Sequence, residues 1–169
     1  MFLSPKIPFV FLLIFQLLTA HAQNSDKIKT EFLKRKGIEK VAYYEKLNLN
    51  QKRAYRDFFY QNLPKLASDD GINANKKTQI RYKFSLAEVY NIKEAELQSI
   101  EILKEIQNDK DYQLSETEHM NVLVGLQKSY LNLNLYSNVF KINSEISALR
   151  KKGAYFTPGY SYMTRPSRC

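Results

Sequence analysis

The feature that most constrains this chain is an apolar pattern that repeats at an interval of 40 residues. Shifting the sequence by 40 positions places Leu86 on Leu126 and Tyr90 on Tyr130. The same shift aligns three further pairs, which are Ile100 with Phe140, Ile102 with Ile142 and Ile106 with Ile146. Residues four positions apart lie on one face of a helix, so each unit presents an apolar stripe on each of two helices. One helix pair cannot bury such stripes alone, which indicates that the units stack as a core.

Local signals divide the repeated region into four helices. Only five glycines and five prolines occur in 169 residues, and scarce turn residues favour helices over a sheet fold. Asn75 is a predicted N-cap for a helix over 76–91, which a second helix over 93–108 follows. Ser115 and Glu118 have the spacing of a capping box at the start of a third helix, which ends near residue 132. A fourth helix runs to about residue 152, where basic side chains and then Gly153 are typical of a helix end.

The region before these pairs, 23–72, has a weaker helical pattern. Residues 25–36 form a short amphipathic helix or a solvated arm, which Gly37 ends. Residues 38–47 have apolar side chains at helical spacing, and Asn50 is the expected cap of a helix over 51–66. Pro64 either kinks that helix or ends it early. Residues 68–71 read as a turn.

The two units resemble the tetratricopeptide repeat family. Leu86, Ala87 and Tyr90 match the core of the family's first helix, and Ser99 stands where the family has a small residue. In the second unit the equivalent places are filled by Leu126, Tyr130, Tyr136 and Val139. Larger residues replace expected small ones at Gln127, Val139 and Ile146, no closing proline is present, and the interval of 40 exceeds the family's, about 34. The resemblance implies an all-α fold: antiparallel helix pairs in a short right-handed solenoid over 73–153. In that family the concave surface binds a protein or peptide, so the candidate binding residues are Lys83, Asn91, Gln127 and Asn134.

The first 22 residues have the order of a secretory signal peptide. A short basic segment over 1–6 precedes an apolar run over 7–18, and Ala20-His21-Ala22 is a small-x-small cleavage site. The run spans 12 residues, whereas a bilayer-spanning helix needs about 20. A cleaved signal is therefore favoured over an uncleaved anchor. We expect a mature chain from Gln23, periplasmic or secreted, with no transmembrane span.

The formal charge of +9 attracts anionic partners, or it serves solubility alone. An exported protein rarely meets nucleic acid, so we expect none as a partner. Contact with an anionic envelope surface remains open, and three short basic runs, 34–36, 76–77 and 150–152, are the segments that would make it.

Residues suited to catalysis are scarce. The mature chain has one histidine, His119, and one cysteine, Cys169, which is the last residue. These cannot supply the three or four ligands of a zinc site, and a nucleophile on a loose terminus lacks a fixed base. We therefore expect no enzyme activity, no metal and no cofactor.

The helical pattern stops after Gly153. Residues 154–169 contain Pro158 and Pro166 and have no helical period. They are either an irregular tail or the sign of a truncated member of a longer repeat protein. The alternative function follows from the second reading: the outer sensing region of a bacterial signal-transduction receptor, a histidine kinase or transcriptional regulator, cut off before its membrane span.

Overall fold

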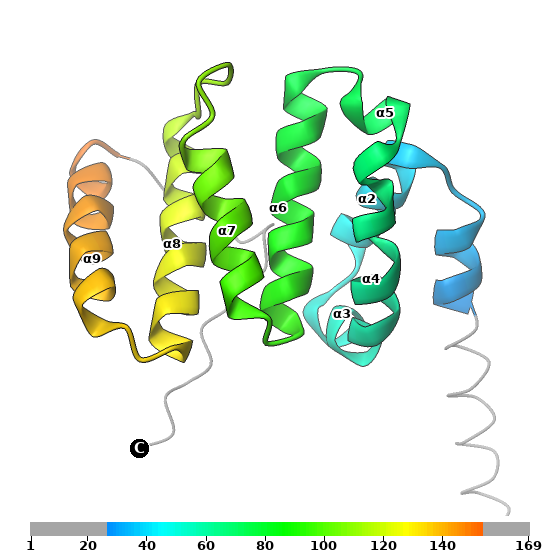
Figure 1. Cartoon of the computed structure of the whole chain (residues 1–169), viewed down its shortest axis with the longest axis horizontal. Coiled ribbons are helices and arrows are strands. Elements are labelled where there is room, and N and C mark those ends of the chain that lie inside the picture. Colours follow the sequence, from blue (N-terminus) through cyan, green and yellow to red (C-terminus); the bar gives the residue numbers. More distant parts are fainter. Residues whose placement is uncertain (1–26, 154–169) are drawn as a thin grey trace, which may run out of the picture. The chain divides into compact units, whose positions relative to one another are not determined.

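In the computed structural model, residues 27–153 are described, and every regular element within them is a helix (Figure 1). This confirms the all-α class for that range. Residues 27–33 are helical and belong to a separate unit, whereas residues 37–153 belong to a second compact unit. The predicted signal peptide (1–22) and irregular tail (154–169) lie outside the described residues. Within residues 27–153, no helix is both long and apolar enough to cross a bilayer.

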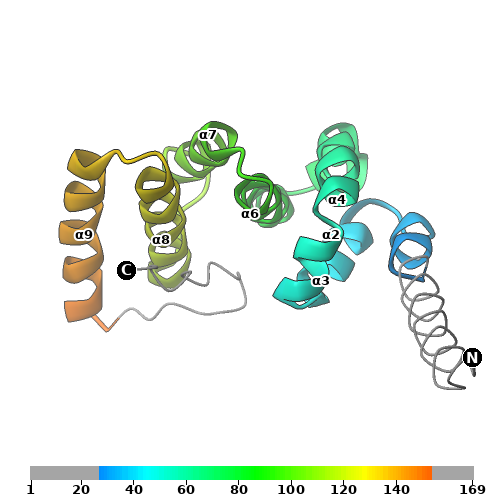
Figure 2. The ribbon, with the colours of Figure 1, turned by 90° about the horizontal axis from the view of Figure 1, so that it is seen from below.

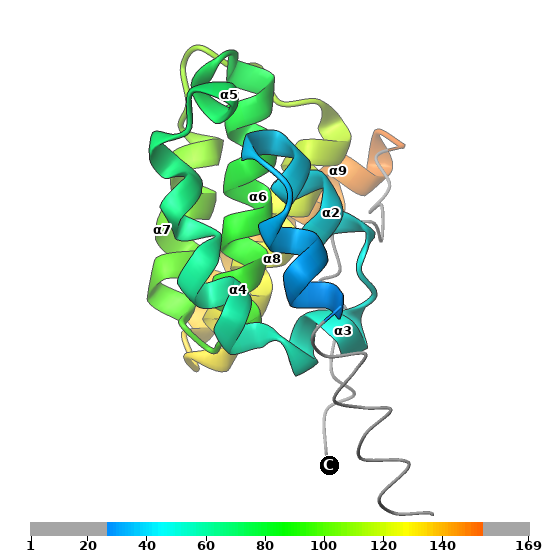
Figure 3. The same ribbon diagram turned by 90° about the vertical axis from the view of Figure 1, so that its right-hand side faces the viewer.

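Short helical segments form the first part of the second unit. They are α2 (Gly37–Lys46), α3 (Leu49–Ala54), α4 (Arg56–Asn62), the 3-10 helix η1 (Pro64–Ser68) and α5 (Asp70–Asn73). Val41 and Tyr44 are buried at helical spacing on α2, which confirms the helix predicted over 38–47. Figure 3 shows α2, α4 and α5 in front of α6 (Lys76–Ile92), and each of them contacts that helix.

The single helix predicted over 51–66 is wrong. Asn48, not Asn50, caps the first segment, because its side chain accepts a hydrogen bond from the Gln51 amide and the Gln51 side chain accepts one from the Asn48 amide, both at 3.0 Å. The helix then breaks at Tyr55, whose φ of −108° and ψ of 21° leave the helical range. Pro64 takes the first position of η1, since its missing amide is no loss there.

Gly37 begins a helix rather than ending one, so the predicted stop is a second correction. Its φ of +45° lies in the left-handed region, which side chains rarely adopt. A Cβ at this position would lie 2.5 Å from a carboxylate oxygen of Asp69. Both observations require glycine at the point where α2 starts.

Four longer helices form the rest of the unit: α6, α7 (Glu96–Gln107), α8 (Glu116–Asn132) and α9 (Tyr136–Lys151). Consecutive helices pack on one another, and Figures 1 and 2 show them in that order. The predicted caps are confirmed. Asn75 accepts from the Thr78 amide, Ser115 and Glu118 form the capping box, and Gly153 has a φ of +88° just beyond α9.

The two hairpins share their turn geometry at the 40-residue interval. Glu94 and Asn134 both have positive φ, 65° and 58°. The next amides, of Ala95 and Leu135, donate to the carbonyls of Tyr90 and Tyr130 at 2.8 and 2.9 Å. This hydrogen bond, with a left-handed residue directly before its donor, defines a Schellman motif at the end of each first helix. The same turn therefore positions α7 on α6 and α9 on α8.

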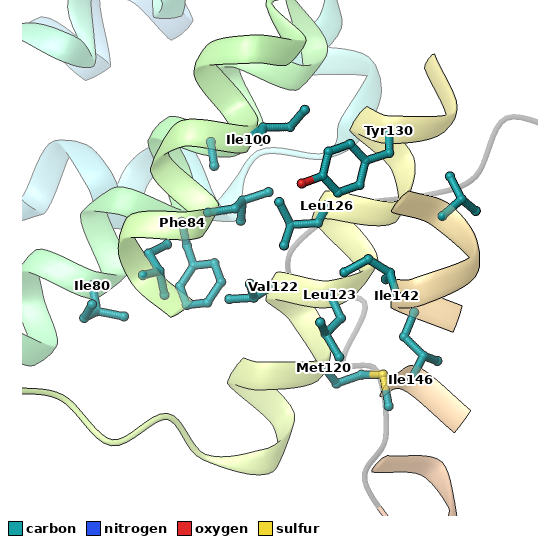
Figure 4. Packing of buried hydrophobic residues seen from close by; sticks show 14 residues of the cluster. Ile80, Phe84, Ile100, Met120, Val122, Leu123, Leu126, Tyr130, Ile142 and Ile146 are labelled. Carbon is teal, nitrogen blue, oxygen red and sulfur yellow. The ribbon is translucent and has the colours of Figure 1, made fainter. Parts of the chain in front are cut away.

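One apolar cluster runs through the four long helices (Figure 4). Phe84 lies beside Val122, and Leu123 and Met120 lie beside Ile142 and Ile146. Most residues of the predicted stripes are buried, Tyr90 and Ile102 are half-buried, and each fully buried aliphatic side chain stabilises the fold by about 1.5–3 kcal/mol. Phe140 departs from the prediction, because it is exposed where its counterpart Ile100 is buried.

Candidate binding surface

Three ion pairs join the N-terminal helices to α6 and to Lys93 at its C-terminal end. The two partners of each pair are the same number of residues apart in the sequence. Arg81 binds Glu45, Glu88 binds Lys52 and Lys93 binds Asp57, and each pair is separated by 36 residues. The N-terminal segments and α6 are therefore paired in the same residue order. The three ion pairs together fix the position of these segments along α6.

The middle pair, between Lys52 and Glu88, is buried. The ammonium lies 2.8 Å from Glu88 Oε2 and 4.5 Å from the centre of the Tyr44 ring. The second carboxylate oxygen, Oε1, has no hydrogen-bond partner among the described residues. Charges held out of water stabilise one another only while both are present. The arrangement ties α3 to α6.

A second buried polar group lies where α6, α7 and α8 meet. The Asn91 amide donates to Glu96 Oε2 at 3.0 Å and to Ser129 Oγ at 3.2 Å. Asn132 donates to the other Glu96 oxygen. Helix α8 thus covers Asn91 and Glu96, which are 4% and 6% exposed. This network of hydrogen bonds joins α8 to the hairpin that precedes it, which is α6 and α7.

Positions at or beside the contact between α8 and the first hairpin have exposed counterparts on the second hairpin. The 40-residue shift carries Asn91, Ala95, Glu96 and Ile100 onto four large apolar residues, which we call the α8–α9 end face: Leu131, Leu135, Tyr136 and Phe140. Phe140 is 73% exposed against 8% for Ile100, and Tyr136 is 56% exposed against 6% for Glu96. Leu131 and Leu135 are exposed by 45% and 42%. Single exposed apolar residues are ordinary, but these four follow one another closely around the α8–α9 turn, at positions equivalent to the part of the first hairpin that packs near α8.

Three of the four substitutions make the end face more apolar than the surface that α8 covers. Leucine replaces asparagine, leucine replaces alanine, and tyrosine replaces glutamate. If these residues served solubility, the exposed copy of the repeat would be the more polar one. The sequence therefore equips the end face for burial against another molecule.

The second helices of the two hairpins, α7 and α9, also differ in charge. Helix α7 carries Glu96, Glu101 and Glu105 with the single base Lys104. Helix α9 carries three basic residues and one acidic residue, all exposed: Lys141, Arg150, Lys151 and Glu145. Tyr136 and Phe140 of the end face therefore lie on a basic helix, whereas the equivalent helix of the first hairpin is acidic.

The predicted binding residues lie in different settings. Asn91 is buried in the polar group described above, and Lys83 forms an ion pair with Glu105 at 2.9 Å. Asn134 is the exposed left-handed residue of the second turn and accepts a hydrogen bond from the Tyr136 hydroxyl at 3.0 Å. Gln127 donates to Asn143 across α8 and α9. Asn134 is thus bonded to a member of the end face, Gln127 bonds within the same hairpin, and the other two lie in the first hairpin.

The end-face residues were not predicted as a site. The alignment with Ile100 predicts a core position for Phe140, the repeat pattern predicts one for Tyr136, and neither pattern assigns a role to Leu131 or Leu135. The signal that finds them is the polarity of aligned positions: a shift of 40 pairs Asn91 with Leu131 and Glu96 with Tyr136. Apolar periodicity alone does not detect a position that is polar in one unit and apolar in the other.

Shifted pKa values belong to contacts between elements. Burial raises the pKa of Tyr82 to about 12, and its hydroxyl donates to the carbonyls of Leu63 and Pro64 at 3.3 Å. A hydrogen bond to Asp109 raises the pKa of Lys76, and the same bond lowers the pKa of Asp109. The first contact holds α6 to η1, and the second holds it to the loop before α8. Neither forms a reacting pair.

Metal-binding clusters are absent from residues 27–153: no three histidine, cysteine, aspartate or glutamate side chains there come together. His119 is half-buried in the first turn of α8. Comparisons of the chain with models of protein families, with curated protein sequences and with solved structures find no match. The function is therefore argued from the chain's own surface.

Proposed function

We propose that this protein is an exported, non-catalytic helical-repeat protein that binds another protein or a peptide. The observation that carries the proposal is the α8–α9 end face, whose residues correspond to a surface that is covered in the preceding hairpin. A catalytic site needs convergent polar groups in a cleft, whereas this surface offers four large apolar side chains, two of them on the basic helix α9. Such a surface suits association with a macromolecule.

The tetratricopeptide-like architecture is part of the same proposal. It is supported by the first helices of the two hairpins, which have equivalent bounds, by the second helices, which begin at equivalent residues, and by the matching Schellman turns. It is also supported by Ser99, whose hydroxyl donates to the Ala87 carbonyl at 3.1 Å where α7 crosses α6. Small residues at such a crossing let two helices approach closely.

A protein partner is favoured over an anionic envelope surface because many cations are already paired. Lys34 and Arg35 bind Glu31, Lys76 binds Asp109, and Arg81 binds Glu45. Paired cations contribute little to long-range attraction. Of the three basic runs in the sequence, the one at the end of α9 is exposed throughout.

Export is tested by expressing the full gene in a secretion-competent host and sequencing the N-terminus of the exported product. We expect Gln23 as the first residue. A product that retains Met1 and sediments with the membrane would contradict cleavage. Ala22→Tyr should block processing, because the cleavage site accepts only small side chains.

Binding is tested by photo-crosslinking. A photoreactive phenylalanine analogue is placed at Phe140 in one sample and at Leu97 in a matched control, because Leu97 is an exposed apolar residue of α7. Both proteins are incubated with extracytoplasmic extract of the source organism. We expect a defined protein adduct from position 140 and none from position 97. Adducts from neither position would contradict a binding role for this surface.

A further inference from the structure

We propose that the α8–α9 end face receives one amphipathic helix of a partner protein, with acidic residues beside its apolar stripe. This inference rests on the proposed binding function and names the chemistry of the partner. The partner helix would lie on α8 and α9 as α8 lies on α6 and α7.

The first step is the shape of the surface. Helix α8 contributes Val122 and Leu126 to the core and Ser129 to the polar group, so the hairpin α6–α7 accepts a helix along its full length. Hairpin α8–α9 has the same turn and the same apolar contact between its helices. A helix is therefore the secondary structure that its outer side fits.

The second step is the polarity of the partner's stripe. On the first hairpin, Asn91 and Glu96 are buried polar groups, and α8 satisfies them with Ser129 and Asn132. At the equivalent positions the largely apolar side chains of Leu131 and Tyr136 need no such hydrogen-bond partners. A partner helix therefore presents leucine-like side chains at a spacing of three and four residues. The Tyr136 hydroxyl already bonds Asn134 at the rim.

The third step is charge. Lys141, Arg150 and Lys151 outnumber Glu145 on α9. Acidic flanks on the partner are attracted to this helix, and basic flanks are repelled. The same argument disfavours a second copy of this chain, because a symmetric contact would place two basic α9 helices together.

The experiment measures the binding of two synthetic peptides by fluorescence anisotropy. Each has 17 residues, the length of α8, with leucines at helical spacing. Glutamates flank the stripe in the first peptide, and lysines replace every glutamate in the second. We expect the acidic peptide to bind the purified protein at least about tenfold more tightly than the basic one. Its affinity should fall as salt rises.

Variants locate the site. Phe140→Asp and Leu135→Asp should each weaken the acidic peptide at least about tenfold, as expected for central interface residues. Leu97→Asp, on α7, should leave the affinity unchanged. Both target side chains are exposed, so circular dichroism should show the helical fold in all three variants.

Four results would overturn the proposal. They are equal binding of the two peptides, an undiminished affinity in Phe140→Asp, a dimer that Phe140→Asp converts to a monomer, and binding that appears only after residues 154–169 are removed. The third would assign the face to a second copy and the fourth to the chain's own C-terminal segment. If the photo-crosslink forms but the peptides do not bind, the binding function stands and this assignment of the partner fails.

Discussion

Lys52 and Glu88 are the buried charged residues that join α3 to α6, and both are almost wholly shielded from solvent. Moving two charges out of water costs several kcal/mol each, and their attraction repays this only in good geometry. The 2.8 Å contact and the Tyr44 ring supply that geometry. The pair therefore specifies where α3 sits more than it adds to stability.

Removing one member of this pair should be strongly destabilising. Glu88→Leu leaves an uncompensated ammonium in the interior, and we expect the free energy of unfolding to fall by about 3–5 kcal/mol. The double variant with Lys52→Met should recover most of the loss, since two apolar side chains of similar size need no solvation. Urea unfolding followed by circular dichroism measures both values.

The matched control is the Lys83–Glu105 pair, which has a similar distance of 2.9 Å but is partly exposed. Lys83→Met should change the free energy of unfolding by no more than about 1 kcal/mol. An equal loss in Lys83→Met and in Glu88→Leu would mean that burial does not control the cost at position 88.

Glu94 and Asn134 hold the same left-handed position in the two turns, but they tolerate it differently. The left-handed region costs a side chain about 1–2 kcal/mol, and asparagine is among the residues that enter it most readily. Glu94→Gly should therefore stabilise the protein by about 0.5–1 kcal/mol, after the added entropy of the unfolded glycine is counted. Asn134→Gly should change stability less. Thermal unfolding of the two variants tests this order, and a larger gain from Asn134→Gly would contradict it.

Single residues were predictable where the signal is local. Asn75, Ser115 and Gly153 act through hydrogen bonds or backbone angles within a few residues, so the sequence reveals them directly. Gly37 was misread because its requirement comes from Asp69, a residue 32 positions away. No local pattern distinguishes a glycine that ends a helix from one that clears space for a distant side chain.

At the scale of the element, the capping box of α8 combines local bonding with charge. The Ser115 side chain and amide bond the Glu118 carboxylate, and the Tyr112 hydroxyl donates to it at 2.8 Å. Partial burial would raise the pKa of Glu118, but these hydrogen bonds outweigh burial and lower it. The carboxylate is therefore more stable in the folded state than in the unfolded chain.

The lowered pKa predicts a pH dependence. The contribution of Glu118 is fully present above its unfolded pKa, about 4.3, and is lost as the pH falls through the lower folded value. Glu118→Gln keeps a hydrogen-bonding side chain but cannot titrate, so its free energy of unfolding should fall less steeply below pH 5 than that of the wild type. Urea titrations at several pH values measure this difference.

The Ser115 side of the same cap is tested by Ser115→Ala. This change removes the hydroxyl that accepts from the Glu118 amide and donates to the Glu118 carboxylate, and it should cost about 1 kcal/mol at neutral pH. Thr117→Ala, in the same first turn but outside the capping bonds, is the control and should cost less. Equal losses would contradict the capping explanation, and helix propensity could not account for them, because alanine is a better helix former than serine or threonine.

The four long helices were predictable because each has a cap, a long apolar period and a clear end. The helix over 51–66 was not. Its aromatic residues 58–60 continue a helical period through Tyr55, and no glycine or proline marks the break there. The break follows from packing. Lys52 contacts Glu88 and Phe59 contacts Tyr44, and these contacts are made by two separate helices, α3 and α4. Tertiary contacts thus overrode a continuous local pattern.

At the scale of the whole molecule, the repeat predicted which residues are equivalent but not which are covered. Ile100 and Phe140 occupy the same position in their hairpins, and their exposures differ because α8 covers only the first. Burial in stacked hairpins depends on the neighbouring unit. A periodic pattern therefore predicts too many core residues in the second hairpin. The residues that it wrongly assigns to the core, such as Phe140, are the ones that indicate the end face.

The arrangement around α6 predicts cooperative unfolding of residues 37–153. This helix contacts α2, α4 and α5 on one side and α7 on another, and its buried residues face nearly all directions.

Phe59→Ala, in α4, should lower the free energy of unfolding by about 3–5 kcal/mol. If the unit unfolds as one, hydrogen exchange of the slowest amides in α8 should accelerate as much as exchange of those in α4. Phe140→Ala, on the exposed end face, should leave both unchanged. Acceleration confined to α2–α5 would show instead that the hairpins hold their structure without the N-terminal helices. The ion pairs at the 36-residue interval argue against that result, because unfolding of the N-terminal helices would break all three pairs and expose the apolar side of α6 that these helices cover.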